Sequence, residues 1–120
     1  MNDLAVLDSE ALDRLREWGG DDLVVKMLDL FMEHGPERVA QIRSGVETGS
    51  LEETQRGAHS LKSSAGNLGA RRLQAGAARL EGLADEGDLD AVEELLPELE
   101  REFREAKRSL EEVLRTLSSP

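Results

Sequence analysis

Apolar residues recur at intervals of three and four positions along most of this 120-residue chain. The longest run covers residues 89–117 and consists of Leu89, Val92, Leu96, Leu99, Phe103, Ala106, Leu110, Val113 and Leu117. Two shorter stripes are formed by Leu51, Thr54, Ala58, Leu61, Ala65 and Leu68, and by Leu23, Met27, Leu30 and Phe31. This interval places the side chains of a stripe on one face of an α-helix, whereas a half-buried strand alternates apolar and polar residues. The pattern therefore predicts amphipathic helices.

Capping and helix-breaking residues divide the chain into about five helical segments. We expect a short helix that begins at Asp8 or Ser9 and stops at Gly19-Gly20, then segments at residues 21–49, 51–69, about 71–86 and 89–117. Gly35-Pro36 is predicted to interrupt the second segment, because proline lacks the N–H that a helix interior requires. Pro36 would then begin the continuation of that segment.

Two further signals mark where helices start. Ser50 is followed three residues later by Glu53, which is a capping-box pattern, and Asp88 can cap the last helix. The connections between segments are short, and short connections force neighbouring helices to run in opposite directions. The sequence thus predicts an all-α fold, an antiparallel up-and-down four-helix bundle with a short additional N-terminal helix. We expect residues 1–120 to form one domain with its bundle core at about 21–117.

Composition supports a helical protein and narrows its chemistry. Leu, Ala, Glu and Arg dominate, and the aromatic residues are Trp18, Phe31 and Phe103. The chain has no cysteine, which excludes disulfides and thiolate chemistry. It has no basic-then-apolar start and no long apolar run, so we expect a cytoplasmic protein without a membrane span. A net charge of −11 argues against binding to nucleic acid or anionic lipid.

A cluster of acidic residues is the one feature that suggests a metal site. An EF-hand loop starting at Asp85 would need a bidentate glutamate at position 96, which is Leu96. The cluster is better interpreted as a turn followed by the cap of the last helix, so we expect no metal. No nucleophile has a plausible base and orienting acid, and we expect the chain not to be an enzyme.

The charge is unevenly distributed along the chain. Residues 54–80 contain no Asp or Glu but include Arg56, Lys62, Arg71, Arg72 and Arg79. Such a segment is typical of a surface that meets an anion, such as a phosphoryl group or an acidic partner. The other interpretation is a solvated basic face that balances acidic neighbours.

Of the two histidines, His59 has the more informative position. Gln55, His59, Lys62 and Gly66 form a second stripe beside the core face of segment 51–69, so their side chains should be partly exposed. A neutral imidazole is a good phosphoryl acceptor, Lys62 can neutralise a phosphate, and Gly66 leaves room for a partner. An exposed helical histidine is also common as a simple surface residue. His34 is expected at a helix end, where it suits the terminal carbonyls.

The stretch AHSLKSSAGNLGA, residues 58–70, resembles the signature of the histidine phosphotransfer (HPt) domain family. Members relay phosphoryl groups in multistep two-component signalling, and the apolar pattern from about residue 21 to residue 114 fits their helical bundle. The resemblance implies that His59 is phosphorylated at Nε2 and that Lys62 is the charge partner of the phosphate. It implies that Glu81, otherwise a solvated helix position, holds the other imidazole nitrogen.

The resemblance also implies a docking surface for a partner, formed by Gln55, Ser63, Gly66 and Asn67. Ser63 departs from the family pattern, since many members have glycine four residues after the histidine. Gly57 stands where a bulkier helix former is expected, and we predict that it brings a partner closer.

The function implied is that of a phosphoryl carrier without kinase activity. His59 would accept the group from the aspartate of a receiver domain and pass it to another receiver. The partners would be response-regulator receiver domains and a hybrid sensor kinase, with Mg²⁺ on the receiver and no cofactor of its own. We expect a monomer. The alternative is a non-catalytic interaction module, such as a dimer formed through an overhanging end of the 89–117 run.

Overall fold

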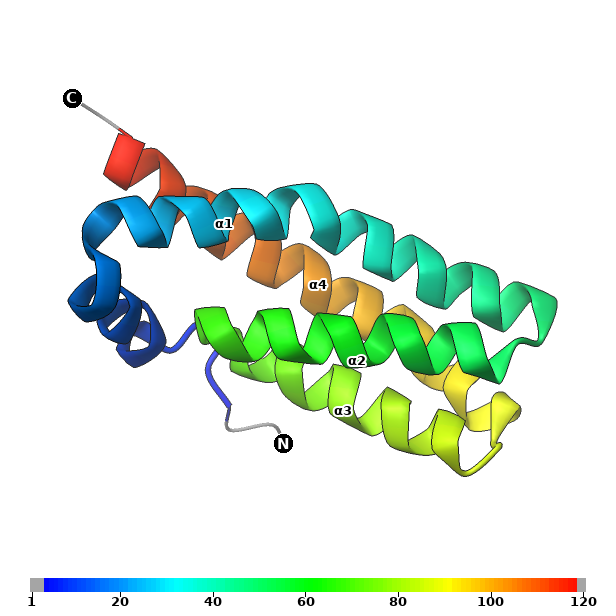
Figure 1. Ribbon diagram of the computed structural model, residues 1–120. Helices are drawn as coiled ribbons and strands as arrows, with labels where there is room; N and C mark the ends of the chain where they lie inside the picture. The colour runs from blue at the N-terminus through cyan, green and yellow to red at the C-terminus, as the bar shows by residue number, and fades with distance from the viewer. Residues whose placement is uncertain (1–3, 119–120) are drawn as a thin grey trace.

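The computed structural model describes residues 4–118, which form four helices and no strand. The helices are α1 (Ser9–Thr48), α2 (Leu51–Leu68), α3 (Arg71–Asp85) and α4 (Leu89–Ser118). Each helix contacts the next one in the chain, and α4 also contacts α1. Figure 1 shows the four helices packed side by side, with successive helices running in opposite directions. The predicted all-α class is confirmed. No helix in residues 4–118 is long and apolar enough to cross a membrane.

The side chains predicted to cap the starts of helices form capping hydrogen bonds in the structure. The Ser50 hydroxyl accepts a hydrogen bond from the backbone N–H of Glu53 at 3.2 Å. The Asp8 carboxylate accepts one from Glu10, and the Asp88 carboxylate accepts one from Ala91 at 3.1 Å. These side chains satisfy N–H groups that have no partner within the first helical turn. Asp88, in the acidic cluster that begins at Asp85, therefore caps the start of α4.

Helix α1 contains one of the two predicted breaks. The segment expected as a separate short N-terminal helix is joined to the next segment at Gly20, whose non-helical backbone (φ 70°, ψ −170°) kinks α1 at the predicted Gly19-Gly20 stop. The predicted interruption at Gly35-Pro36 is wrong, because α1 continues through Pro36 to Thr48. His34 is consequently in the body of a helix and not at its end. Its Nδ1 atom contacts Glu37 at 3.2 Å.

Packing explains why the helix continues through Pro36. Gly35 is buried, and a Cβ at this position would lie 2.9 Å from Cε1 of Phe103. Phe31 and Ile42, on either side of the proline, are both buried. The core holds both halves of the segment in place, at the cost of the hydrogen bond that Pro36 cannot donate. Gly35 thus permits close packing and does not end the helix.

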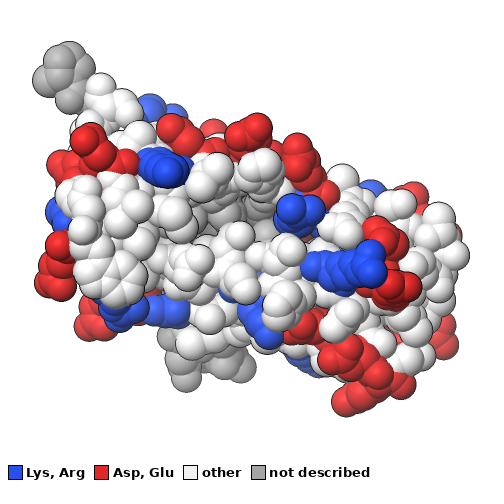
Figure 2. Space-filling view, viewed as in Figure 1, with Lys and Arg blue, Asp and Glu red and all other residues white. Residues whose placement is uncertain are grey.

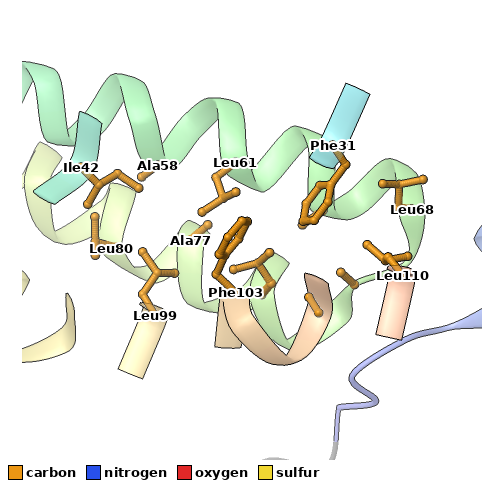
Figure 3. Close-up of a cluster of buried hydrophobic side chains, with 14 of the residues drawn as sticks. Phe31, Ile42, Ala58, Leu61, Leu68, Ala77, Leu80, Leu99, Phe103 and Leu110 are labelled. Atoms are coloured by element: carbon orange, nitrogen blue, oxygen red, sulfur yellow. The ribbon is translucent and has the colours of Figure 1, made fainter. Parts of the chain in front are cut away.

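The core receives side chains from all four helices (Figure 3). The rings of Phe31 and Phe103 meet at its centre, with their centroids 5.6 Å apart. The predicted stripe of α2 is buried at Thr54, Ala58, Leu61, Ala65 and Leu68, and α3 buries Leu73, Ala77, Leu80 and Ala84. Near the end of α4, Val113, Leu114 and Leu117 pack against the same core. The apolar run of α4 therefore packs against the core of the same chain as far as its C-terminal end.

Glycines allow α1 and α2 to approach closely. Gly57 is buried, and a Cβ there would lie 2.7 Å from Cγ1 of Ile42 and 3.1 Å from the carbonyl oxygen of Arg38. A Cβ at Gly45 would lie 2.5 Å from Oγ1 of Thr54. The prediction that Gly57 brings a partner closer is wrong, because α1 of the same chain occupies this space. These contacts fix the register between α1 and α2.

Replacing Gly57 with alanine tests this contact. Gly57→Ala should destabilise the protein by about 1–3 kcal/mol, because the added methyl group overpacks the interface with Ile42 and the α1 backbone. Gly82→Ala is the control, since a Cβ at this position meets nothing within 4 Å. That change should stabilise the protein by about 0.5–1 kcal/mol through helix propensity. Urea unfolding measures both, and equal stabilisation by both substitutions would contradict the close approach.

Candidate functional site

His59 projects from the outer side of α2 and is the most exposed member of a three-residue cluster, with 62% of its side chain accessible. Its Nδ1 atom lies 2.7 Å from Oε2 of Glu81, which belongs to α3. Its other ring nitrogen, Nε2, has no hydrogen-bond partner among residues 4–118. The ring is thus held at one nitrogen and accessible at the other.

Glu81 joins His59 to Lys62. Its side chain is 12% exposed, and its second oxygen, Oε1, accepts a hydrogen bond from Nζ of Lys62 at 2.6 Å. The pKa of the Glu81 carboxyl lies below its ordinary value, mainly because of the hydrogen bond from Lys62 and also because of the hydrogen bond with His59. Together these contacts outweigh the effect of burial, which raises the pKa. Glu81 is therefore ionised at neutral pH.

The charge of Glu81 determines the tautomer of His59. An ionised carboxylate has no hydrogen to donate, so the 2.7 Å contact requires that Nδ1 of His59 carries the proton. In the neutral ring the lone pair available to an electrophile is then on Nε2. The arrangement presents a nucleophilic nitrogen at the surface of the molecule.

Lys62 has a more specific position than the sequence indicated. One third of its side chain is exposed, and its ammonium group is directed to Glu81. An ammonium group has three N–H donors, and the contact with Glu81 uses one of them. Lys62 thus neutralises the carboxylate that orients the imidazole.

Three of the four predicted docking residues lie beside His59. Ser63 and Asn67 line a hollow between α1 and α2, next to His59, and Gln55 lines a second hollow on the other side of the histidine. Gly66 faces α3, where a Cβ would lie 2.7 Å from Nε2 of Gln74. Gly66 therefore faces the end of the Gln74 side chain of α3 and not the hollows beside His59.

Sequence reasoning missed the part of this surface that α1 supplies. Met27, Leu30, His34 and Arg38 line the hollow that contains His59. The stripe pattern assigned Leu30 to the core, but 39% of it is exposed. No local signal could have paired these residues with His59, since the pairing depends on the register between two helices.

The basic segment is largely balanced by acidic neighbours. Four of its five cations form ion pairs, namely Arg56 with Glu52, Lys62 with Glu81, Arg71 with Asp8, and Arg72 with Glu105. Around His59 the pattern is different, because no Asp or Glu lines either hollow in the described part of the chain. Figure 2 shows a broad uncharged area over α1 and α2, with separate Lys and Arg patches and acidic residues toward its margins. The two hollows therefore present no carboxylate to an anion, and the carboxylate next to His59, that of Glu81, is paired with Lys62.

Residues 4–118 contain no group of three His, Asp or Glu residues that could hold a metal ion. The exposed imidazole of His59 and its partners Glu81 and Lys62 form the candidate site, and comparison with known proteins indicates its chemistry.

The family model of the Hpt domain matches residues 26–116, and the chain belongs to this family. Hpt proteins are phosphocarriers and not kinases, so the chain has a histidine phosphotransfer role in two-component phosphorelay. Its structure is similar to the crystal structure of histidine-containing phosphotransfer protein B (HptB) from Pseudomonas aeruginosa PAO1. The TM-score is 0.85 at 28% sequence identity, covering 92% of this chain and 96% of the other. No curated protein matches the chain by sequence.

The pH dependence of stability tests the Glu81 contacts. Because the folded-state pKa of Glu81 is lowered, its contacts stabilise the protein above the ordinary pKa of 4.5, and the stabilisation is lost as the pH falls through the folded-state pKa. Glu81→Gln should therefore cost about 1 kcal/mol at pH 7 and much less in acid. Urea unfolding at both pH values measures the difference.

Glu93→Gln provides the matched control, because Glu93 is exposed on α4 and has no ion pair within residues 4–118. It should change stability little at either pH. A Glu81→Gln protein as stable as the native protein at pH 7 would contradict the contacts described for Glu81.

Proposed function

We propose that the chain accepts a phosphoryl group on Nε2 of His59 from the aspartate of a receiver domain and passes it to another receiver. The observation that carries this proposal is the 2.7 Å contact between Nδ1 of His59 and Glu81, which leaves Nε2 as the free nucleophile. Membership of the Hpt family supports the class of reaction.

The transfer step follows from the protonation state of the ring. The Nε2 lone pair attacks phosphorus and forms an N–P bond, while the P–O bond to the aspartate breaks and leaves its electron pair on the carboxylate. Nδ1 keeps its proton throughout, so the ring becomes a cationic imidazolium. The Glu81 carboxylate, already bonded to Nδ1, stabilises this positive charge. Return of the phosphoryl group to a second aspartate reverses each of these changes.

Lys62 contributes to the same step in two ways. Its ion pair keeps Glu81 ionised, and its remaining N–H donors make it the charge partner of the phosphate on the α3 side. The reaction needs no cofactor on this chain, because the receiver supplies Mg²⁺ together with the aspartate. The carrier contributes an oriented nucleophile and positive charge.

The receiver would dock over the exposed area around His59. Gln55, Ser63, Gly66 and Asn67 are the docking residues that the family resemblance indicates, and the hollow beside His59 adds Met27 and Leu30 from α1. A mixture of small polar and apolar side chains suits a transient interface. A hybrid sensor kinase would supply the phosphoryl group to the first receiver. We place the chain in the cytoplasm as a monomer, consistent with the burial of the α4 apolar run in its own core.

Substitution of His59 tests the proposed acceptor. Native protein treated with phosphoramidate should gain one acid-labile, base-stable phosphate, and His59→Gln should gain none, because glutamine has no nucleophilic ring nitrogen. His34→Gln is the control and should still carry one phosphate. Intact mass and ³¹P NMR measure the label, and circular dichroism verifies that each variant is helical. Equal labelling of His59→Gln and native protein would overturn the proposal.

A further inference from the structure

Arg38 borders His59 on both sides. It is the one residue besides His59 and Ser60 that lines both hollows next to the histidine, counting the residues that the structure describes. It comes from α1, whereas His59 comes from α2 and Lys62 contacts Glu81 of α3. The imidazole therefore has a cationic side chain on its α1 side as well as Lys62 on its α3 side.

The backbone of Arg38 is held next to α2. Its carbonyl oxygen would lie 3.1 Å from a Cβ at Gly57, two residues before His59. Such an approach is possible because Gly57 has no side chain, and it fixes Arg38 at the level of the histidine. The position of the Arg38 backbone beside His59 thus results from a close contact between the two helices.

Arg38 is also available for a ligand. Its side chain is partly exposed and forms no hydrogen bond or ion pair within residues 4–118. The other arginine lining these hollows, Arg56, is paired with Glu52 at 2.7 Å. With no carboxylate lining either hollow, the positive charge of Arg38 is not neutralised locally.

The phosphorylated site carries a net negative charge that the guanidinium group of Arg38 can balance. The phosphoryl group carries close to two negative charges at neutral pH, while the imidazolium ring carries one positive charge. Lys62 and Glu81 largely cancel each other, because their side chains are 2.6 Å apart. One further cation would therefore balance the site, and a guanidinium group can donate two parallel hydrogen bonds to phosphate oxygens.

We propose that Arg38 is a second phosphate-binding residue, whose guanidinium group binds the phosphoryl oxygens on Nε2 of His59 from the α1 side. This inference rests on the proposed function and deepens it. As the N–P bond forms and the P–O bond to the donor breaks, Arg38 neutralises charge on the oxygens that remain bonded to phosphorus. It takes no part in proton transfer, since the Nδ1 proton stays between His59 and Glu81.

The test uses the full chain with phosphoramidate as the phosphoryl donor. The initial rate of labelling, followed by intact mass, should fall about tenfold in Arg38→Ala, the usual effect of losing a hydrogen bond to a charged group. Arg38→Lys should recover part of the rate, because it retains the charge but not the paired donors. Arg104→Ala is the matched control: Arg104 is exposed on α4, which lines neither hollow, and its loss should leave the rate unchanged.

A second measurement separates phosphate binding from a structural role. The pH titration of the ³¹P shift reports when the phosphoryl group takes up a proton. Loss of a nearby guanidinium group should move this transition to higher pH in Arg38→Ala. A merely structural effect of the substitution would leave the transition where it is in the native protein.

The outcomes distinguish this inference from the proposed function. Slower labelling together with a shifted titration supports Arg38 as a phosphate-binding residue. Native rate and native titration in Arg38→Ala would overturn the inference and leave His59 as the acceptor. Absence of label on the native protein would overturn the proposed function, and the inference with it.

Discussion

The Glu81 carboxylate accepts hydrogen bonds from both His59 and Lys62, and the chemistry of the site depends on this shared acceptor. One oxygen holds Nδ1 of the imidazole, and the other holds an ammonium group that keeps the carboxylate ionised. Without Glu81, the proton of a neutral His59 ring would be free to occupy either nitrogen, and the exposed ring would have no fixed orientation. With it, a mostly exposed histidine presents one defined nucleophilic atom. The same carboxylate also stabilises the phosphorylated product, since the imidazolium formed on phosphorylation already has Glu81 as its negative partner.

The fold maintains this geometry by burying residues next to the functional ones. Ala58 and Leu61 flank His59 in α2, and Leu80 precedes Glu81 in α3; all three are fully buried. The two helices are therefore fixed relative to each other by the core, while their adjacent outward side chains meet at the surface. On the other side, the Gly57 contact sets the position of α1 and its Arg38. The packing that stabilises the bundle thus brings Arg38 of α1 and Glu81 of α3 next to the His59 imidazole.

Local signals in the sequence predicted much of this arrangement. The Ser50 cap, the buried α2 stripe and the outward position of His59 each depend on a few consecutive residues, and the structure contains all three. The Gly35-Pro36 break was wrong because the prediction counted one lost hydrogen bond but not the burial of Phe31, Gly35 and Ile42 around it. Glu81 lies against His59 as the resemblance implied, whereas Arg38 was not foreseen. Its proximity to His59 depends on the contact between α1 and α2, which no local pattern contains.

The identity of the nitrogen that carries the proton on His59 is the central claim, and ¹⁵N NMR of the histidine rings tests it most directly. Spectra of the native protein above the pH at which the ring is protonated identify the neutral tautomer, and spectra after phosphoramidate treatment identify the phosphorylated nitrogen. The account predicts the proton on Nδ1 and phosphorus on Nε2, with the Nδ1 preference lost in Glu81→Ala. A neutral ring with its proton on Nε2, or phosphorus on Nδ1, would contradict it.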